Sequence, residues 1–130
     1  MKFLLDTCIF LWFISGDKRL PYSIIEAICI PDNEVILSAV SEWEIMIKYQ
    51  IGRLPLPKPP AVYIPMQRKR HGISSLPLDE DSVIQLDKLP VIHRDPFDRI
   101  LICQAIQHNL TLVTIDKLMM SYPVKIFSKY

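Results

Sequence analysis

The stretch KFLLDTCIFLWFIS, residues 2–15, joins an apolar run of strand length to an apolar segment of helical length through one aspartate. Lys2–Leu5 predicts a buried strand and Cys8–Ser15 predicts a helix. The apolar residues 3–14 could also belong to a signal peptide. However, Asp6 interrupts them, Lys2 is the only basic residue before them, and no small-residue cleavage site follows. The run is also too short to span a membrane. We therefore interpret these residues as a buried strand leading into a helix.

The same alternation continues along the chain. Further short apolar runs predict strands at Glu34–Ser38, Thr111–Thr114 and Val124–Phe127, with a weaker one at Ile73–Leu76. Segments with helical spacing lie between them, at Tyr22–Cys29, Val40–Gln50, Ala61–Arg70, Asp79–Leu86 and Pro96–His108. Strands that alternate with helices favour right-handed crossovers and a parallel sheet covered on both faces. The predicted fold class is an open α/β sandwich whose ligand site lies at the carboxyl ends of the strands.

Composition limits the class of protein. The chain has 130 residues, which fits one compact domain over residues 1–130, and half of them are hydrophobic, which excludes general disorder. Its net charge of +1 excludes a uniformly basic nucleic-acid-binding protein of the histone type, although a local basic patch is compatible with this charge. The three cysteines form no CxxC pair, so neither a disulfide framework nor a zinc site is expected. We expect a reducing compartment, the cytoplasm, and no membrane partner.

The acidic residues fall into two groups. Several lie in polar segments, where we expect solvated, capping or turn roles: Asp17, Asp32, Glu34, Asp79, Glu80, Asp81 and Asp87. Four others lie in or beside apolar runs: Asp6, Glu44, Asp98 and Asp116. The strands ending at Leu5 and Thr114 are expected to be neighbours, which would gather these four acids at one sheet edge. Such a cluster needs a counter-ion, and all-oxygen ligands favour Mg²⁺ or Mn²⁺ and phosphodiester chemistry.

Each of these acids also has an ordinary structural interpretation. Asp6 and Asp116 are each suited to capping a following helix. Asp98 suits the first turn of its own helix, or an ion pair with Arg94 or Arg99. Glu44 lies four residues before Lys48, the spacing of a surface ion pair on a helix.

Four motifs resemble those of a known family. They are LLDTCIFLWFI at residues 4–14, SAVSEWEIMIKYQIGRLPLP at 38–57, LPVIHRDPFDRILICQA at 89–105 and LTLVTID at 110–116. Together they resemble the PIN domain, in the subgroup of VapC-like toxin ribonucleases of toxin–antitoxin pairs, from about Phe3 to Phe127. The resemblance implies a three-layer α/β/α sandwich with a mostly parallel sheet of four or five strands. It also implies a metal-dependent endoribonuclease, a homodimer and a cognate antitoxin that fills a groove.

Carried over by position, the resemblance makes Asp6, Glu44, Asp98 and Asp116 the catalytic, metal-binding acids, and Glu42 falls outside the matching position. Asp95 is a fifth candidate metal ligand, acting through water, or else a helix cap. A supporting role beside the acids is expected of Thr7 and, more weakly, of Ser38 and Thr114. Relatives often have His or Asn where this chain has Cys8, to which we assign no catalytic role.

Basic residues offer candidate RNA contacts. Arg68, Lys69 and Arg70 form part of the one dense basic run, which is either a solvated helix end or a phosphate-binding patch. His93 and Arg94 precede Asp95 and are candidates for contacts near the metal, although Arg94 is equally suited to pairing with an acid.

Other functions remain open at this point. A metal-dependent DNA or flap nuclease uses similar acidic sites. A receiver-like phospho-acceptor or an inert binding module is the non-nuclease alternative, but a receiver requires a lysine at the end of a late strand, and Lys125 lies inside its predicted strand. The three widely separated glycines form no phosphate-binding loop, which argues against a nucleotide cofactor.

Overall fold

The computed structural model describes residues 1–128 and contains one five-stranded sheet in which every neighbouring pair of strands is parallel. The strand order is β3-β2-β1-β4-β5. The strands are β1 (Lys2–Leu5), β2 (Glu34–Ser38), β3 (Ser74–Leu76), β4 (Thr111–Val113) and β5 (Ile126–Phe127). The helices are α1 (Thr7–Ser15), α2 (Tyr22–Cys29), α3 (Ala39–Gln50), α4 (Pro60–His71), α5 (Glu80–Ile84), α6 (Pro96–Gln107) and α7 (Lys117–Met120), with a 3₁₀ turn at Gln85–Asp87. The predicted α/β fold class is confirmed.

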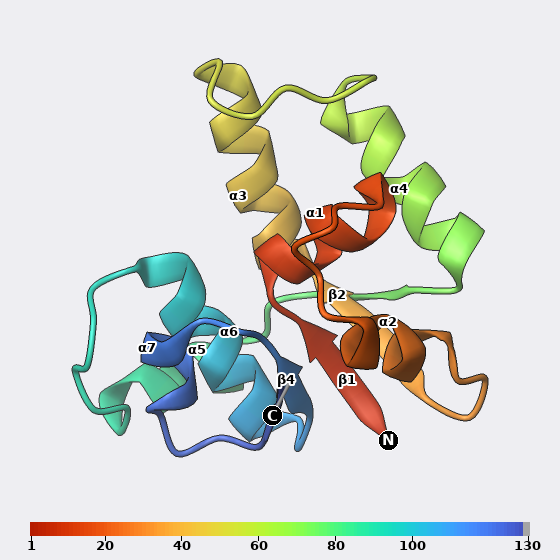
Figure 1. Cartoon of the computed structure of the whole chain (residues 1–130). Helices are drawn as coiled ribbons and strands as arrows, with labels where there is room; N and C mark the ends of the chain where they lie inside the picture. Colours follow the sequence, from red (N-terminus) through yellow and green to blue (C-terminus); the bar gives the residue numbers. More distant parts are fainter. Residues whose placement is uncertain (129–130) are drawn as a thin grey trace.

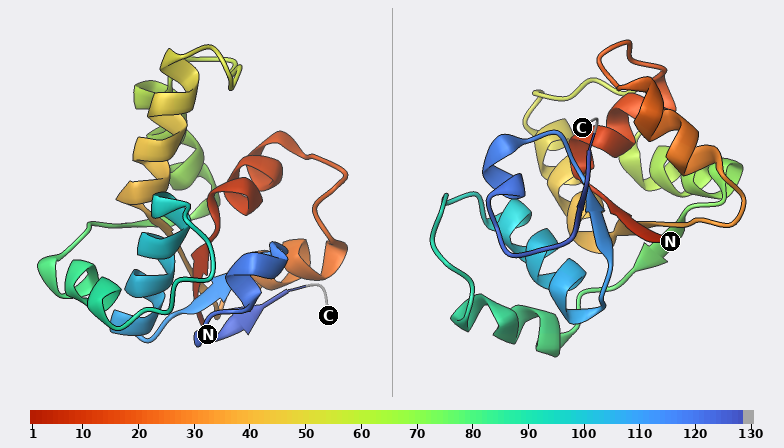
Figure 2. Two further views of the ribbon diagram at one scale, coloured as in Figure 1. Left: turned by 90° about the vertical axis from the view of Figure 1, so that its left-hand side faces the viewer. Right: turned by 60° about the horizontal axis from the view of Figure 1, so that its bottom comes forward.

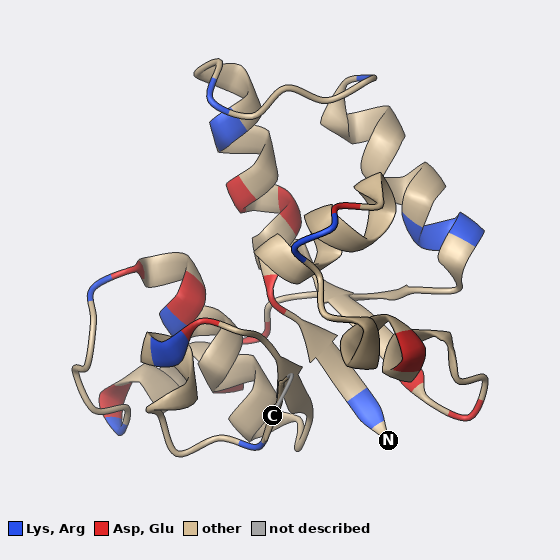
Figure 3. Ribbon diagram, viewed as in Figure 1, with Lys and Arg blue, Asp and Glu red and all other residues tan. Residues whose placement is uncertain are grey.

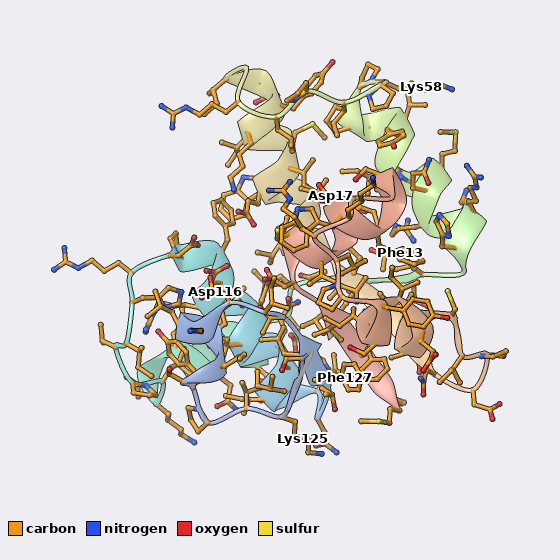
Figure 4. All side chains as sticks on the ribbon, in the orientation of Figure 1. Phe13, Asp17, Lys58, Asp116, Lys125 and Phe127 are labelled. Atoms are coloured by element: carbon orange, nitrogen blue, oxygen red, sulfur yellow. The ribbon has the colours of Figure 1, made fainter. Side chains whose placement is uncertain are left out.

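Helices cover both faces of the sheet because consecutive strand residues point to opposite sides. In β1, Phe3 and Leu5 pack into a core with residues of α1, α2 and α4, whereas Leu4 packs into a second core with residues of α6 and α7. Figure 1 shows α1, α2 and α4 on one side of β1, and α5, α6 and α7 on the other. The aromatic ring of Phe127, labelled in Figure 4, lies 5.2 Å from that of Phe3 and closes the first core.

The two central strands end side by side. In β1 and β4, Leu5 is in register with Val113, and the backbone N–H of Asp6 donates to the Val113 carbonyl at 3.0 Å. Asp6 and Thr114 are therefore the first residues beyond two adjacent strands. The strands that the apolar runs predicted to end at Leu5 and Thr114 are therefore neighbours, as expected, although the second ends one residue earlier, at Val113.

Several element boundaries differ from the prediction. The helix expected over Asp79–Leu86 ends as an α-helix at Ile84 and tightens into the 3₁₀ turn, a common ending for short helices. The last strand begins at Ile126 and not at Val124, shortly after Pro123. A four-residue helix, α7, follows Asp116, as the capping interpretation of that residue anticipated.

The connector at residues 51–59 joins α3 to α4 at the end of the molecule away from the sheet (Figure 2). Its Leu54 and Leu56 pack against the first core, which includes residues of α1. Across residues 1–128, none of the helices combines the length and apolar character that crossing a bilayer would need.

Candidate active site

Asp6 lies at the end of β1 and occupies the N-cap position of α1, but its side chain does not cap that helix. Its Oδ2 instead accepts a hydrogen bond from Thr114 Oγ1 at 2.9 Å. Both side chains are buried, with Asp6 only 7% exposed. The capping interpretation is therefore wrong for Asp6, whose carboxyl group is held at the sheet edge by the neighbouring strand.

Glu44 lies in the middle of α3 and is buried, with 5% of its surface exposed. Lys48, one helical turn further on, donates to Glu44 Oε2 at 2.8 Å, so the four-residue spacing predicted the pair correctly, but the carboxylate is buried and not at the surface. The other oxygen, Glu44 Oε1, is buried and has no hydrogen-bond partner within residues 1–128. A buried oxygen without a donor is costly, so this atom is suited to accepting a hydrogen bond or binding a cation.

Asp98 lies in the first turn of α6 and is half-buried. Its Oδ2 is 3.1 Å from His93 Nε2, whereas Arg99, one of the two arginines expected to pair with it, donates to the Pro90 carbonyl and to Tyr122. Figure 3 shows acidic segments on α3, at the end of β1 and in α6.

Asp95 and Asp116 are both exposed helix caps. Asp95 Oδ1 accepts the backbone N–H groups of Phe97 and Asp98, at 2.9 and 3.1 Å, and Asp116 Oδ1 accepts that of Leu118 at 2.8 Å. Capping engages one oxygen of each carboxylate. Each residue therefore keeps a second oxygen that faces no helix N–H.

One cleft of about 500 Å³ collects all five candidate acids: Asp6, Glu44, Asp95, Asp98 and Asp116. Its other wall is formed by α1 and the connector, through Leu11, Trp12, Leu54 and Leu56. Three basic residues, Arg19, Lys48 and Arg53, also line it. The cleft therefore combines an acidic floor with basic and apolar walls at the carboxyl edge of the sheet.

Burial, together with the neighbouring acids, raises the pKa values of two carboxyl groups in the cleft. Burial raises the pKa of Asp6 to about 7, with smaller upward contributions from Asp98, Glu44 and Asp116, while the Thr114 hydrogen bond opposes the rise. Burial likewise raises the pKa of Asp98 to about 6, opposed by the hydrogen bond to His93 and increased by the charges of Asp95 and Glu44. The negative charge of the cleft is therefore only partly balanced by the chain itself.

The residues fit a hard divalent cation. The donor set is all oxygen, it includes the unpartnered Glu44 Oε1, and the cluster favours a positive charge. Among residues 1–128, however, no three His, Cys, Asp or Glu side chains already surround a common point closely enough to hold a metal. Binding a cation would therefore require the carboxylates to turn toward one another.

The three hydroxyl residues predicted beside the acids have different surroundings. Thr114 contacts Asp6 directly and also accepts the backbone N–H of Asp116 at 3.0 Å. Thr7 lines the cleft and donates to Ser41 Oγ at 2.8 Å. Ser38 is fully buried, and its hydroxyl group accepts the backbone N–H of Val40 and donates to the Gln104 side chain rather than to an acid.

The basic run does not line the cleft. Arg68 pairs with Glu42 at 3.2 Å and donates to the Ile73 carbonyl, while Lys69 and Arg70 are exposed at the end of α4. Of the two candidates beside Asp95, His93 is engaged by Asp98 and Tyr122, and Arg94 is exposed.

The sequence pattern missed several lining residues. Arg19 and Asp17, which follow α1, form a bidentate pair with distances of 3.1 and 2.7 Å, and Arg19 lies 4.7 Å from the centre of the Trp12 ring. Asp17, labelled in Figure 4, lines the cleft, although its polar segment predicted an ordinary solvated or turn residue. Arg53 lies in the connector and reaches the cleft through the path of that segment. No local sequence signal reveals such long-range placement.

An all-parallel α/β sandwich with an acidic cleft at the carboxyl edge of its sheet, lined by the buried carboxylates of Asp6 and Glu44, defines a class of acidic-site α/β domains. A family model described as "PIN domain" matches residues 3–123, and the chain therefore belongs to the PIN domain family. The resemblance of the four motifs is thereby confirmed.

Individual relatives agree with this assignment. The chain is 49% identical over 47 residues to Ribonuclease VapC16 of Mycobacterium tuberculosis, a match that spans 36% of this chain and about a third (33%) of that relative's length. The fold is similar to VapBC2 from Rickettsia felis bound to promoter DNA (TM-score 0.75, 16% identity, 98% of each chain). It is also similar to DNA-bound VapBC from Salmonella typhimurium (TM-score 0.72, 18% identity, 100% of this chain and 99% of that one). At these identities the two structures establish the fold alone.

Proposed function

We propose that this protein is a divalent-metal-dependent endoribonuclease and the toxin of a toxin–antitoxin pair. The observation that carries the proposal is the placement of Asp6, Glu44, Asp98 and Asp116 in one cleft, with an unsatisfied buried oxygen on Glu44. The partial match to a protein named as a ribonuclease favours RNA as the substrate.

Each part of the cleft has a role in this proposal. The four acids would hold Mg²⁺ or Mn²⁺, with Asp95 as a further ligand through water. The ion, when bound, polarises a phosphoryl oxygen and lowers the pKa of an attacking water. Thr114 orients the Asp6 carboxylate, and the basic side chains on the other wall bind the flanking phosphates. Hydrolysis is expected to leave 5′-phosphate and 3′-hydroxyl ends.

Cleavage of a labelled RNA in Mn²⁺ and in EDTA tests the metal requirement. We expect cleavage in Mn²⁺ alone, and loss of cleavage in Asp6→Asn but not in Asp81→Asn, a matched change of an exposed acid on α5. Equal cleavage in EDTA would exclude the metal mechanism. A DNA strand of the same sequence is the parallel substrate, and faster cleavage of DNA would replace RNA as the proposed target.

Lys125, the lysine considered for the receiver-like alternative, does not lie near the acids. Lys125 Nζ donates to Asn109 Oδ1 at 2.6 Å, and Asn109 precedes β4, so this lysine lies near the amino end of the strand, away from the acids. Phosphate incorporation from acetyl phosphate without nuclease activity would nevertheless restore that alternative.

We further propose a cytoplasmic homodimer inhibited by a small DNA-binding antitoxin. The similar folds occur in complexes described as VapBC, and Trp43, which is 58% exposed beside the ring of Phe97, is a candidate contact for a partner. The free cysteines Cys8, Cys29 and Cys103 suit a reducing compartment. Co-purification with the product of a short neighbouring reading frame, and growth arrest that this product relieves, would test the pairing. Sedimentation of the purified protein would test the dimer.

A further inference from the structure

Tyr122 is a buried residue that no sequence motif singled out, and its hydroxyl group joins two segments beside the cleft. It lies just after α7, which packs beside α6 (Figure 1). The hydroxyl oxygen is 3.3 Å from the backbone nitrogen of Ile92, 3.1 Å from that of His93 and 3.1 Å from Arg99 Nη1. All three of these groups carry hydrogens and can only donate.

These three donors determine which acceptor the Tyr122 hydroxyl proton points to. A phenolic oxygen has two lone pairs, so three N–H donors already saturate it as an acceptor. Its own proton must point to another acceptor, and the nearest one is His93 Nδ1 at 2.8 Å, compared with 3.5 Å for the His93 carbonyl. A proton on His93 Nδ1 would add a fourth donor to the same oxygen. The neutral ring therefore carries its hydrogen on Nε2.

That hydrogen points at the candidate active site. His93 Nε2 lies 3.1 Å from Asp98 Oδ2, and the two side chains are only 11% and 15% exposed. The other charged groups around Asp98 include Asp95 and Glu44, which repel its charge. His93 thus supplies a donor that holds one Asp98 oxygen and leaves the other directed elsewhere.

We propose that Tyr122 and His93 form a hydrogen-bonded pair that positions the Asp98 carboxylate by fixing the Nε2–H tautomer of His93. His93 is then a positioning residue, and with both ring nitrogens engaged inside the protein it does not contact RNA. The effect on cleavage rests on the proposed nuclease function. The tautomer of His93 does not depend on that function, and it can be measured in the metal-free protein.

The first test is a long-range ¹H–¹⁵N spectrum of the His93 ring in metal-free protein at about pH 8.5, well above the ordinary histidine pKa. We expect a protonated Nε2 and an unprotonated Nδ1 in the wild type, and a mixture of tautomers in Tyr122→Phe, which loses only the hydroxyl. A wild-type ring protonated on Nδ1 would overturn the proposal, whatever the enzyme cleaves. The wild-type spectrum decides the question even if Tyr122→Phe fails to fold.

The second test compares two amide replacements. In His93→Gln the side-chain amide reaches about as far as Nε2 and can still donate to Asp98, whereas in His93→Asn it stops near the position of Nδ1. We expect His93→Asn to weaken Mn²⁺ binding, measured by calorimetry, and to lower kcat by about 10- to 100-fold, with His93→Gln within a few-fold of wild type. The matched control is His108→Asn, because His108 also lies 3.1 Å from an aspartate, Asp79, at the other end of α6.

The outcomes separate the two proposals. If no RNA is cleaved, the tautomer and Mn²⁺ affinity still test the positioning role. Equal Mn²⁺ affinity in His93→Asn and wild type would overturn that role. Equal losses in His93→Asn and His93→Gln would also overturn it, because a general structural defect does not distinguish the two amides.

Discussion

Thr114 donates a 2.9 Å hydrogen bond to Asp6 Oδ2, so a hydroxyl group at the end of β4 fixes a carboxyl group at the end of the adjacent β1. The same Thr114 oxygen accepts the backbone N–H of Asp116. One buried side chain therefore links two of the proposed metal ligands. The contact spans 108 residues of sequence and depends on the parallel pairing of the two central strands.

We expect Thr114→Val, which keeps the shape but removes the hydroxyl, to reduce cleavage in Mn²⁺ by about 10- to 100-fold. The Asp6 oxygen loses its donor, so the pKa of Asp6 rises further and the Asp6 side chain is no longer held in one rotamer. Loss of the buried hydrogen bond should also lower the free energy of unfolding by about 1–3 kcal/mol. Rate measurements and thermal unfolding in EDTA check both effects. Thr111→Val, which changes a buried threonine at the start of β4, is the control, and an equal loss of activity in it would contradict the specific role of Thr114.

The raised pKa of Asp6 predicts a pH-dependent stability in the metal-free protein. The folded chain holds this proton up to about pH 7, whereas an unfolded chain releases it near 3.8, so stability falls as the pH rises through that window. The loss attributable to Asp6 is at most about 4 kcal/mol. Asp6→Asn should remove it and be more stable than wild type at pH 8 in EDTA. Urea unfolding at pH 5 and pH 8 measures this, and a wild-type stability that does not fall between them would contradict it.

The sheet and the acids near strand ends were predictable because both depend on local sequence. The runs KFLL and TLVT have strand length and are followed closely by acids, so parallel pairing is enough to bring Asp6 and Asp116 to one edge. The i, i+4 spacing of Glu44 and Lys48 likewise fixes their contact within one helix.

The walls of the cleft were not predictable, because they depend on how loops return to the sheet. Arg53 and Leu54 reach the cleft through the path of the 51–59 connector, and Tyr122 reaches His93 across 29 residues of sequence. The most visible basic run, at residues 68–70, lies outside the cleft because α4 directs its end elsewhere. Charge density along a sequence therefore did not identify which cations face the acids.

We expect Lys48 to weaken Mn²⁺ binding and to strengthen RNA binding. Its ammonium group occupies Glu44 Oε2 at 2.8 Å and adds positive charge beside the cluster, so Lys48→Met should tighten Mn²⁺ binding, by roughly threefold to tenfold. Loss of a cation from the cleft wall should raise the KM for RNA. Calorimetry and steady-state kinetics measure the two effects separately. Lys58→Met, which changes an exposed lysine of the connector (Figure 4), should alter neither quantity, and a weaker Mn²⁺ affinity in Lys48→Met would contradict the competition.

Arg53 and Arg70 distinguish the cleft wall from the basic run as the surface that binds RNA. Arg53 lines the cleft, so Arg53→Gln should raise the KM for RNA and reduce the salt dependence of RNA binding by about one phosphate contact, without changing Mn²⁺ affinity. Arg70 is exposed at the end of α4 and lines no part of the cleft. Arg70→Gln should therefore leave the KM for RNA and the salt dependence of RNA binding unchanged. Binding to a non-cleavable RNA over a range of salt concentrations separates the variants. The reverse result, with the effect in Arg70→Gln alone, would show that RNA follows α4 and not the wall formed by the connector.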